Sequence, residues 1–141
     1  MEFNKIFASK EVQDLVSRYE IFIKTHVHPL EQEAVYGSFK AVLPKLKSLR
    51  ELAKKEGLFA PHLSKEDGGL GLDLTEFASI SEVLGKSPIG HYIFNCNAPD
   101  IGNMELMHRF ASKELKEKYL VPLQKGEIRS CFAMTEPNNP G

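Results

Sequence analysis

The sequence has few cysteines, no excess of charge and no long apolar run, and each absence excludes a class of protein. Two cysteines in 141 residues are too few for the disulfide framework of a small secreted domain, so we expect both thiols to be reduced. The formal net charge of -1 does not favour binding to a nucleic acid or to an anionic membrane surface. No apolar run reaches the roughly 18 residues that a membrane-spanning helix needs. The composition is that of a globular protein, with 42% hydrophobic and 26% charged residues.

The first ten residues resemble neither kind of common targeting segment. They lack the apolar core of a signal peptide and the Arg-rich, acid-poor composition of a transit peptide. We therefore expect the protein to be cytoplasmic, or to lie in an organellar matrix if a targeting segment is missing from this sequence.

Candidate metal ligands and catalytic groups are scattered along the chain. Only His26 and His28 lie close together among the five histidines, and a two-residue spacing points them to different faces of a helix. Cys131 lies in an apolar segment with no base nearby, and the acidic residues are spread along exposed faces. The sequence therefore predicts no metal site and no catalytic residue.

One glycine-rich motif, Gly68-Gly69-Leu70-Gly71, invites comparison with phosphate-binding loops. It matches neither G-x-G-x-x-G nor the P-loop pattern, and no strong strand precedes it. The interpretation we favour is a tight turn whose glycines adopt positive φ angles.

Apolar residues that recur every three or four positions predict a helical array. The first helix begins near Ser9, which suits an N-cap, and Pro29 ends it or forces a turn. The second helix begins at or before Pro44, and Gly57 lies just past its end.

The second half of the chain continues this pattern. Asp73 and Glu76 resemble a capping box at the start of a third helix, which stops at Gly85. Further helical segments follow as far as Gly126, and Ser130–Met134 is short and apolar, which favours a strand. The predicted class is all-α, with about five or six helices and one strand at the end. Because a lone strand is rarely stable, we expect that part of the protein is missing after residue 141.

The segment Cys131-Phe132-Ala133-Met134-Thr135-Glu136-Pro137 resembles the signature of acyl-CoA dehydrogenases, in which a short strand leads into Thr-Glu-Pro at the flavin. Three further features stand in the family's order before it. They are Glu56-Gly57-Leu58 with Pro61 and the glycine turn, the helix containing Ser81-Glu82-Val83-Leu84-Gly85, and Lys116–Leu123 followed by Gly126-Glu127. Phe94–Asp100 with Gly102-Asn103-Met104-Glu105 is similar to the long-chain or hydroxyacyl-type branch of the family.

The resemblance implies a three-part fold: an N-terminal helical domain, a middle β-domain and a C-terminal four-helix domain. Residues 1–128 would form the helical domain, and residues 129–141 would begin the β-domain, cut off inside the flavin motif. The parent protein would be a homodimer or homotetramer.

The resemblance also implies a reaction, the α,β-desaturation of an acyl-CoA thioester with transfer of hydride to FAD. The electrons would then pass to an electron-transfer flavoprotein. The family's glutamate base lies in the C-terminal domain in most members, so no catalytic residue is expected here. We expect this chain alone to be inactive and to bind FAD weakly, because few contacting groups are present.

Site residues are carried over position by position. The residues that match the flavin-lining segment are Phe132, Ala133, Met134, Thr135, Glu136 and Pro137. The Thr135 hydroxyl would hydrogen-bond the polar edge of the ring. The residues that match the acyl-chain pocket are Ile93, Asn97 and Ile101. Asn138-Asn139-Pro140-Gly141 stands where the family has small residues and a Ser-Asp pair, so the serine that meets the flavin phosphate or the substrate is absent.

Two other functions remain open. The chain could be a non-catalytic helical interaction module, which a reading frame continuing into a β-domain would exclude. It could also belong to an acyl-CoA oxidase, which has the same fold and passes electrons to oxygen.

Overall fold

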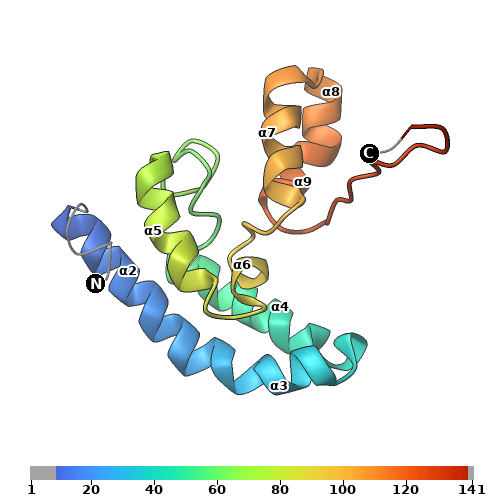
Figure 1. Cartoon of the computed structure of the whole chain (residues 1–141). Coiled ribbons are helices and arrows are strands. Elements are labelled where there is room, and N and C mark those ends of the chain that lie inside the picture. Colours follow the sequence, from blue (N-terminus) through green and yellow to red (C-terminus); the bar gives the residue numbers. More distant parts are fainter. Residues whose placement is uncertain (1–8, 140–141) are drawn as a thin grey trace. The chain divides into compact units, whose positions relative to one another are not determined.

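A computed structural model describes residues 9–139, and the chain divides into two compact units. The first unit is Met1–Cys96 and the second unit is Asn97–Gly141. The described residues form helices joined by turns and loops, with no named strand among them, so the predicted all-α class is confirmed (Figure 1). No helix between residues 9 and 139 is long and apolar enough to cross a bilayer. The expectations for the first residues of the chain and for Pro140-Gly141 fall outside this range.

From residue 10 onwards, the first unit has one continuous helical run, seen in blue in Figure 1. It comprises α2 (Lys10–Phe22), the π-turn η1 (Ile23–Val27) and α3 (His28–Tyr36). Ser9 is the N-cap, as predicted, because its hydroxyl accepts a hydrogen bond from the Val12 backbone N–H at 3.3 Å.

The expectation that Pro29 ends this helix is wrong. The π-turn ends at Val27, two residues before the proline, and its last hydrogen bond runs from the His28 N–H to the Ile23 carbonyl. In a regular α-helix, the proline ring would collide with the carbonyl of the preceding turn. The wider π-turn relieves this crowding, so the helix continues to Tyr36.

Three more helices follow in the described part of the first unit: α4 (Phe39–Lys55), α5 (Leu74–Leu84) and α6 (Gly90–Ile93). The predicted capping box of α5 is present in both directions. The Asp73 carboxylate accepts from the Glu76 N–H at 2.8 Å, and the Glu76 carboxylate accepts from the Asp73 N–H at 2.9 Å.

The buried face of α5 is formed by Ile80, Val83 and Leu84, whereas Leu74 is 83% exposed. Leu74 is the first residue of the helix, where a side chain does not yet lie over the core.

The glycine turn after α4 follows the prediction. Gly68 and Gly71 have φ angles of 84° and 65°, a region that favours glycine. Gly69 has a different reason to be glycine, because a Cβ there would lie 2.3 Å from the Leu63 carbonyl oxygen.

Aromatic residues form the centre of the first unit's core. The rings of Tyr19 and Phe22 each meet the ring of Phe94 edge to face, at centroid distances of 4.9 and 5.1 Å. The Tyr19 hydroxyl donates to the Leu58 carbonyl at 2.6 Å, so the one polar atom of this cluster is satisfied.

The second unit contains α7 (Asp100–Phe110) and a second continuous run, formed by α8 (Lys113–Leu115), the π-turn η2 (Lys116–Leu120) and α9 (Val121–Gln124). This π-turn also ends two residues before a proline, Pro122. The buried apolar side chains of the described part of the second unit are Met104, Leu120 and Leu123.

The strand expected at Ser130–Met134 is not formed. These residues have no regular secondary structure, and an isolated β-bridge further along joins Glu136 to Asn139. A strand is defined by hydrogen bonds to a neighbouring strand, and the described part of the chain contains no neighbouring strand for this segment. The predicted domain boundary between residues 128 and 129 stays a prediction.

Candidate functional site

The carboxylate of Asp100, the first residue of α7, is the polar centre of the second unit. The residue is fully buried. Its Oδ1 accepts hydrogen bonds from the Ser130 backbone N–H at 2.8 Å and from the Ser130 hydroxyl at 2.6 Å. Its Oδ2 accepts from the Arg129 guanidinium. The carboxylate therefore ties residues 129 and 130 to the start of α7.

These donors also set the ionisation of Asp100. Burial alone would raise the pKa of its carboxyl group, because a charge is poorly solvated inside the protein. The hydrogen bonds from Ser130 and the charge of Arg129 outweigh burial and hold this pKa below its usual value. Asp100 is thus a stable anion and is unsuited to exchange protons near neutral pH.

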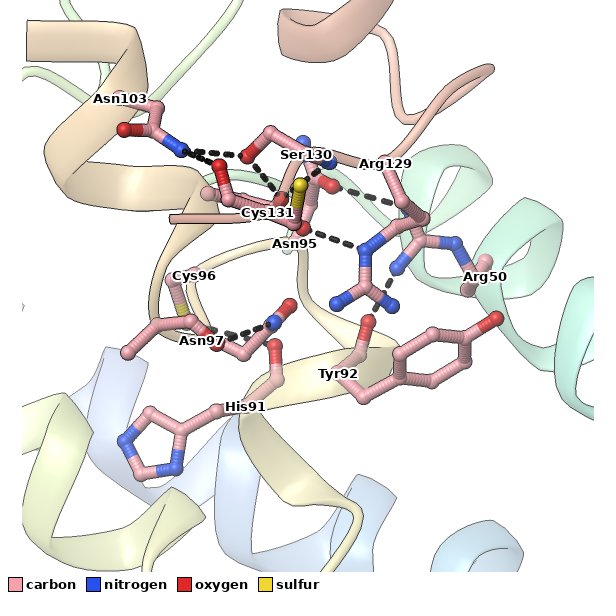
Figure 2. Close-up of polar contacts among 12 residues, drawn as sticks. Arg50, His91, Tyr92, Asn95, Cys96, Asn97, Asn103, Arg129, Ser130 and Cys131 are labelled. Carbon is pink, nitrogen blue, oxygen red and sulfur yellow. Dashed lines mark hydrogen bonds and ion pairs between the residues drawn. The ribbon is translucent and has the colours of Figure 1, made fainter. Parts of the chain in front are cut away.

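Asn103 extends the same cluster one helical turn further along α7. Its Nδ2 donates to the Ser130 hydroxyl oxygen at 2.9 Å and to the Cys131 carbonyl at 3.3 Å (Figure 2). Residues spaced three apart share a helix face, so Asp100 and Asn103 reach the same segment. We call Asp100, Asn103, Arg129 and Ser130 the anchor.

The residues predicted to line a flavin follow the anchor directly. Residues 132–137 are all exposed, and the side chains of Phe132 and Met134 are 63% and 62% exposed. The backbone groups of residues 132–135 make no hydrogen bond within the described chain. Glu136 instead faces Asn139, whose Nδ2 donates to its carboxylate at 3.1 Å. The role of this segment stays a prediction.

A second polar cluster lies in the first unit, around the side chain of Arg50. Arg50 lies on the buried face of α4 and is only 4% exposed. Its guanidinium donates to the Tyr92 carbonyl and, at 2.9 Å, to Asn95 Oδ1 (Figure 2). It also lies 5.1 Å from the centre of the Phe59 ring and 4.9 Å from that of Tyr92. Arg50 therefore fixes the chain where α6 ends.

The three residues predicted for an acyl-chain pocket fall in two units. Ile93, in α6, is completely buried in the first unit. Asn97 and Ile101 are half-buried in the second unit, where the Asn97 carbonyl accepts from the Ile101 N–H at 3.2 Å. The Asn97 side-chain oxygen is buried and has no hydrogen-bond partner among the described residues. Their substrate role stays a prediction.

Sequence reasoning missed both polar clusters. Arg50 could have been found, because it occupies an inward position of α4 between Leu46 and Ala53. Asp100 and Ser130 lie 30 positions apart, and no local spacing signals that they meet. Among residues 9–139, no group of three or more His, Cys, Asp or Glu side chains could hold a metal.

Comparison with known proteins identifies the family of this chain. The model of the family described as "Acyl-CoA dehydrogenase, N-terminal domain" matches residues 9–127. The chain belongs to the acyl-CoA dehydrogenase family. It is 43% identical over 138 residues to "Acyl-CoA dehydrogenase family member 10" of Mus musculus, covering 92% of this chain and 13% of that protein. It is 38% identical over 143 residues to "Acyl-CoA dehydrogenase family member 11" of Gallus gallus, covering 94% of this chain and 18% of that protein.

A solved structure supports the same assignment to the acyl-CoA dehydrogenase family. An acyl-CoA dehydrogenase family protein from Mycobacterium abscessus superposes on this chain with a TM-score of 0.82 at 38% identity. The match covers 94% of this chain and 36% of that structure. The chain therefore spans under a fifth of the two curated relatives and little more than a third of the solved one.

Proposed function

We propose that this chain is the N-terminal helical part of an FAD-dependent enzyme that α,β-dehydrogenates acyl-CoA thioesters. The observation that carries the proposal is the family match over residues 9–127, directly followed by an anchored segment that leads into Phe132–Pro137. As in the sequence interpretation, electrons would pass to an electron-transfer flavoprotein. The parent would be a homodimer or homotetramer in the cytoplasm or an organellar matrix.

The exposed segment has the chemistry that a flavin ring requires. Phe132 and Met134 offer apolar side chains, and the backbone groups of residues 132–135 make no hydrogen bond to another described residue, so they can bind a ligand. Thr135 adds a hydroxyl for the polar edge of the ring. When bound, FAD would supply the chemistry, acceptance of a hydride from the substrate, while these residues would bind and orient the cofactor.

The catalytic base is proposed to lie outside this chain. Within the described residues, the carboxylate with a clearly shifted pKa is Asp100, and its three hydrogen bonds keep it ionised and buried. The chain alone should accordingly be inactive. A titration that follows flavin fluorescence should show weak FAD binding, and tight stoichiometric quenching would contradict this expectation.

The proposal is tested on the complete natural protein that carries this chain. It should be yellow, and an acyl-CoA should reduce its flavin and, through it, an artificial electron acceptor. Thr135→Ala should weaken FAD binding by about tenfold, the effect of losing about 1.4 kcal/mol. Thr75→Ala, at an exposed position of α5, is the matched control. A colourless protein that FAD cannot reconstitute would refute the proposal.

Two alternatives give different results in the same experiment. An acyl-CoA oxidase would form peroxide as substrate is consumed. A non-catalytic interaction module is favoured by the exposed apolar side chains of α7, Leu106 at 54% and Phe110 at 77%. Such a module would bind neither FAD nor an acyl-CoA.

A further inference from the structure

We propose that Asp100 is a positioning residue, whose carboxylate fixes the backbone at Ser130 and so determines where the segment Phe132–Pro137 meets the flavin. This inference rests on the proposed function. It assigns a role to an acidic residue that lies outside the predicted flavin-lining segment.

The first support is that these hydrogen bonds hold backbone groups. Asp100 accepts from the Ser130 backbone N–H as well as from its hydroxyl, so it holds the main chain itself. Asn103 holds the next residue by donating to the Cys131 carbonyl. Two consecutive residues are thus fixed immediately before the predicted flavin contacts begin.

The second support is that the segment has little else to hold it. Residues 130–135 belong to no helix or strand, and residues 131–139 are exposed. Within the described chain, residues 132–135 make no hydrogen bond. The course of Phe132–Pro137 after residue 131 therefore depends on the anchor.

The third support is the cost of the arrangement. A buried carboxylate adds little to net stability, because the loss of its hydration offsets its hydrogen bonds. What such a group supplies well is geometry, since its charge must keep all of its donors in place. A displacement of about 1 Å at a cofactor or substrate contact is enough to lower the rate by about 100-fold.

The local step is tested on this chain by amide hydrogen exchange. Asp100→Asn removes the charge, and we expect the Ser130 amide to exchange at least about tenfold faster, because a hydrogen bond to a charged group is lost. Glu105→Gln makes the same chemical change in the same helix, at an exposed carboxylate that pairs with Arg109 at 2.6 Å. Equal Ser130 exchange in the two variants would overturn the inference.

The functional step is tested on the complete natural protein loaded with FAD. We expect Asp100→Asn to raise the FAD dissociation constant about tenfold and to shift the visible flavin spectrum, with Glu105→Gln unchanged. Ser130→Thr keeps both donors to the carboxylate and should behave as wild type. Ser130→Ala should change the dissociation constant and the flavin spectrum in the same direction as Asp100→Asn. A spectral shift reports the surroundings of the flavin, which a purely structural role would leave unchanged.

The outcomes separate the two ideas. A wild-type protein that never binds FAD overturns the proposed function and the flavin role of Asp100 together. A wild-type protein that binds FAD, with Asp100→Asn identical to Glu105→Gln, overturns the positioning role alone. If Asp100→Asn does not fold, Asn103→Ala decides instead, with an expected rise of about threefold in the dissociation constant for the loss of a neutral hydrogen bond.

Discussion

The two units are stabilised in different ways. The first unit buries large apolar side chains, among them Tyr19, Phe22 and Phe94, in a shared aromatic core. In the second unit, the buried apolar side chains are Met104, Leu120 and Leu123. At its polar centre stands the buried carboxylate of Asp100. A small unit buries little apolar surface, and its hydrogen-bonded charge gives it geometry more than stability.

Removing a large core side chain should break the first unit. Phe22→Ala should lower the free energy of unfolding by about 3–5 kcal/mol, because it removes a fully buried ring that packs against Phe94. Ile21→Ala, one position away and 65% exposed, should change it by less than about 0.5 kcal/mol. Chemical denaturation measures both values. Similar losses in the two variants would show that the apolar core does not dominate.

Acid should destabilise the first unit through His62. Both ring nitrogens of His62 are buried without a hydrogen-bond partner in the described chain, and burial lowers the pKa of this residue to about 4. The unfolded chain binds this proton near pH 6.5, so stability is full above that pH and is lost as the pH falls toward 4. The loss should reach at most about 3 kcal/mol.

Replacing His62 tests this assignment. His62→Leu should remove that part of the pH dependence, and His28→Leu, at an exposed position, should leave it in place. Denaturation curves at several pH values measure it. A slope that survives in His62→Leu must come from another group.

Removing a donor should weaken the second unit's anchor. Ser130→Ala should cost about 2 kcal/mol, because it removes the hydroxyl that donates to the Asp100 carboxylate. Ser48→Ala is the matched control, since that exposed serine bonds only the carbonyl one turn earlier in its helix. Thermal or chemical unfolding gives both values, and an equal effect would mean that the anchor adds no stability.

The smallest effect is expected at the exposed apolar surface of the second unit. Phe110→Ala should change the free energy of unfolding by less than about 0.5 kcal/mol, because its ring is 77% exposed. The same substitution at Phe22 should have a several-fold larger effect. A large loss at Phe110 would show that this surface supports the fold.

Local signals in the sequence predicted the ends of the helices well. Ser9 caps α2, and Asp73 with Glu76 forms the capping box of α5, because each motif acts within four residues. Gly57 follows α4 with a φ angle of 67°, as expected past a helix end. The failure at Pro29 is also physical, since no composition rule indicates that a π-turn will accommodate the ring.

Contacts between distant residues could not be predicted in this way. Asp100 and Ser130 meet only because α7 and the run from α8 to α9 fold back within the second unit. The expected strand at Ser130–Met134 failed for a related reason, since a strand depends on a partner that the local pattern does not specify. The segment Cys131–Pro137, which resembles the family's flavin signature, was visible because it is contiguous, whereas the residues of the anchor before it are not.

The two π-turns also bear on the length of the chain. A π-turn holds one residue more than an α-turn, so deleting a residue within one would restore a regular α-helix and leave the helix after it at the same rotation. After η2, Leu123, which is 2% exposed, would therefore keep its buried position. The cost of such a deletion would fall on Pro29 and Pro122, whose rings would then meet the carbonyls of a regular preceding turn. The same deletion in α4, which has no π-turn, would instead rotate every later residue of that helix by about 100°.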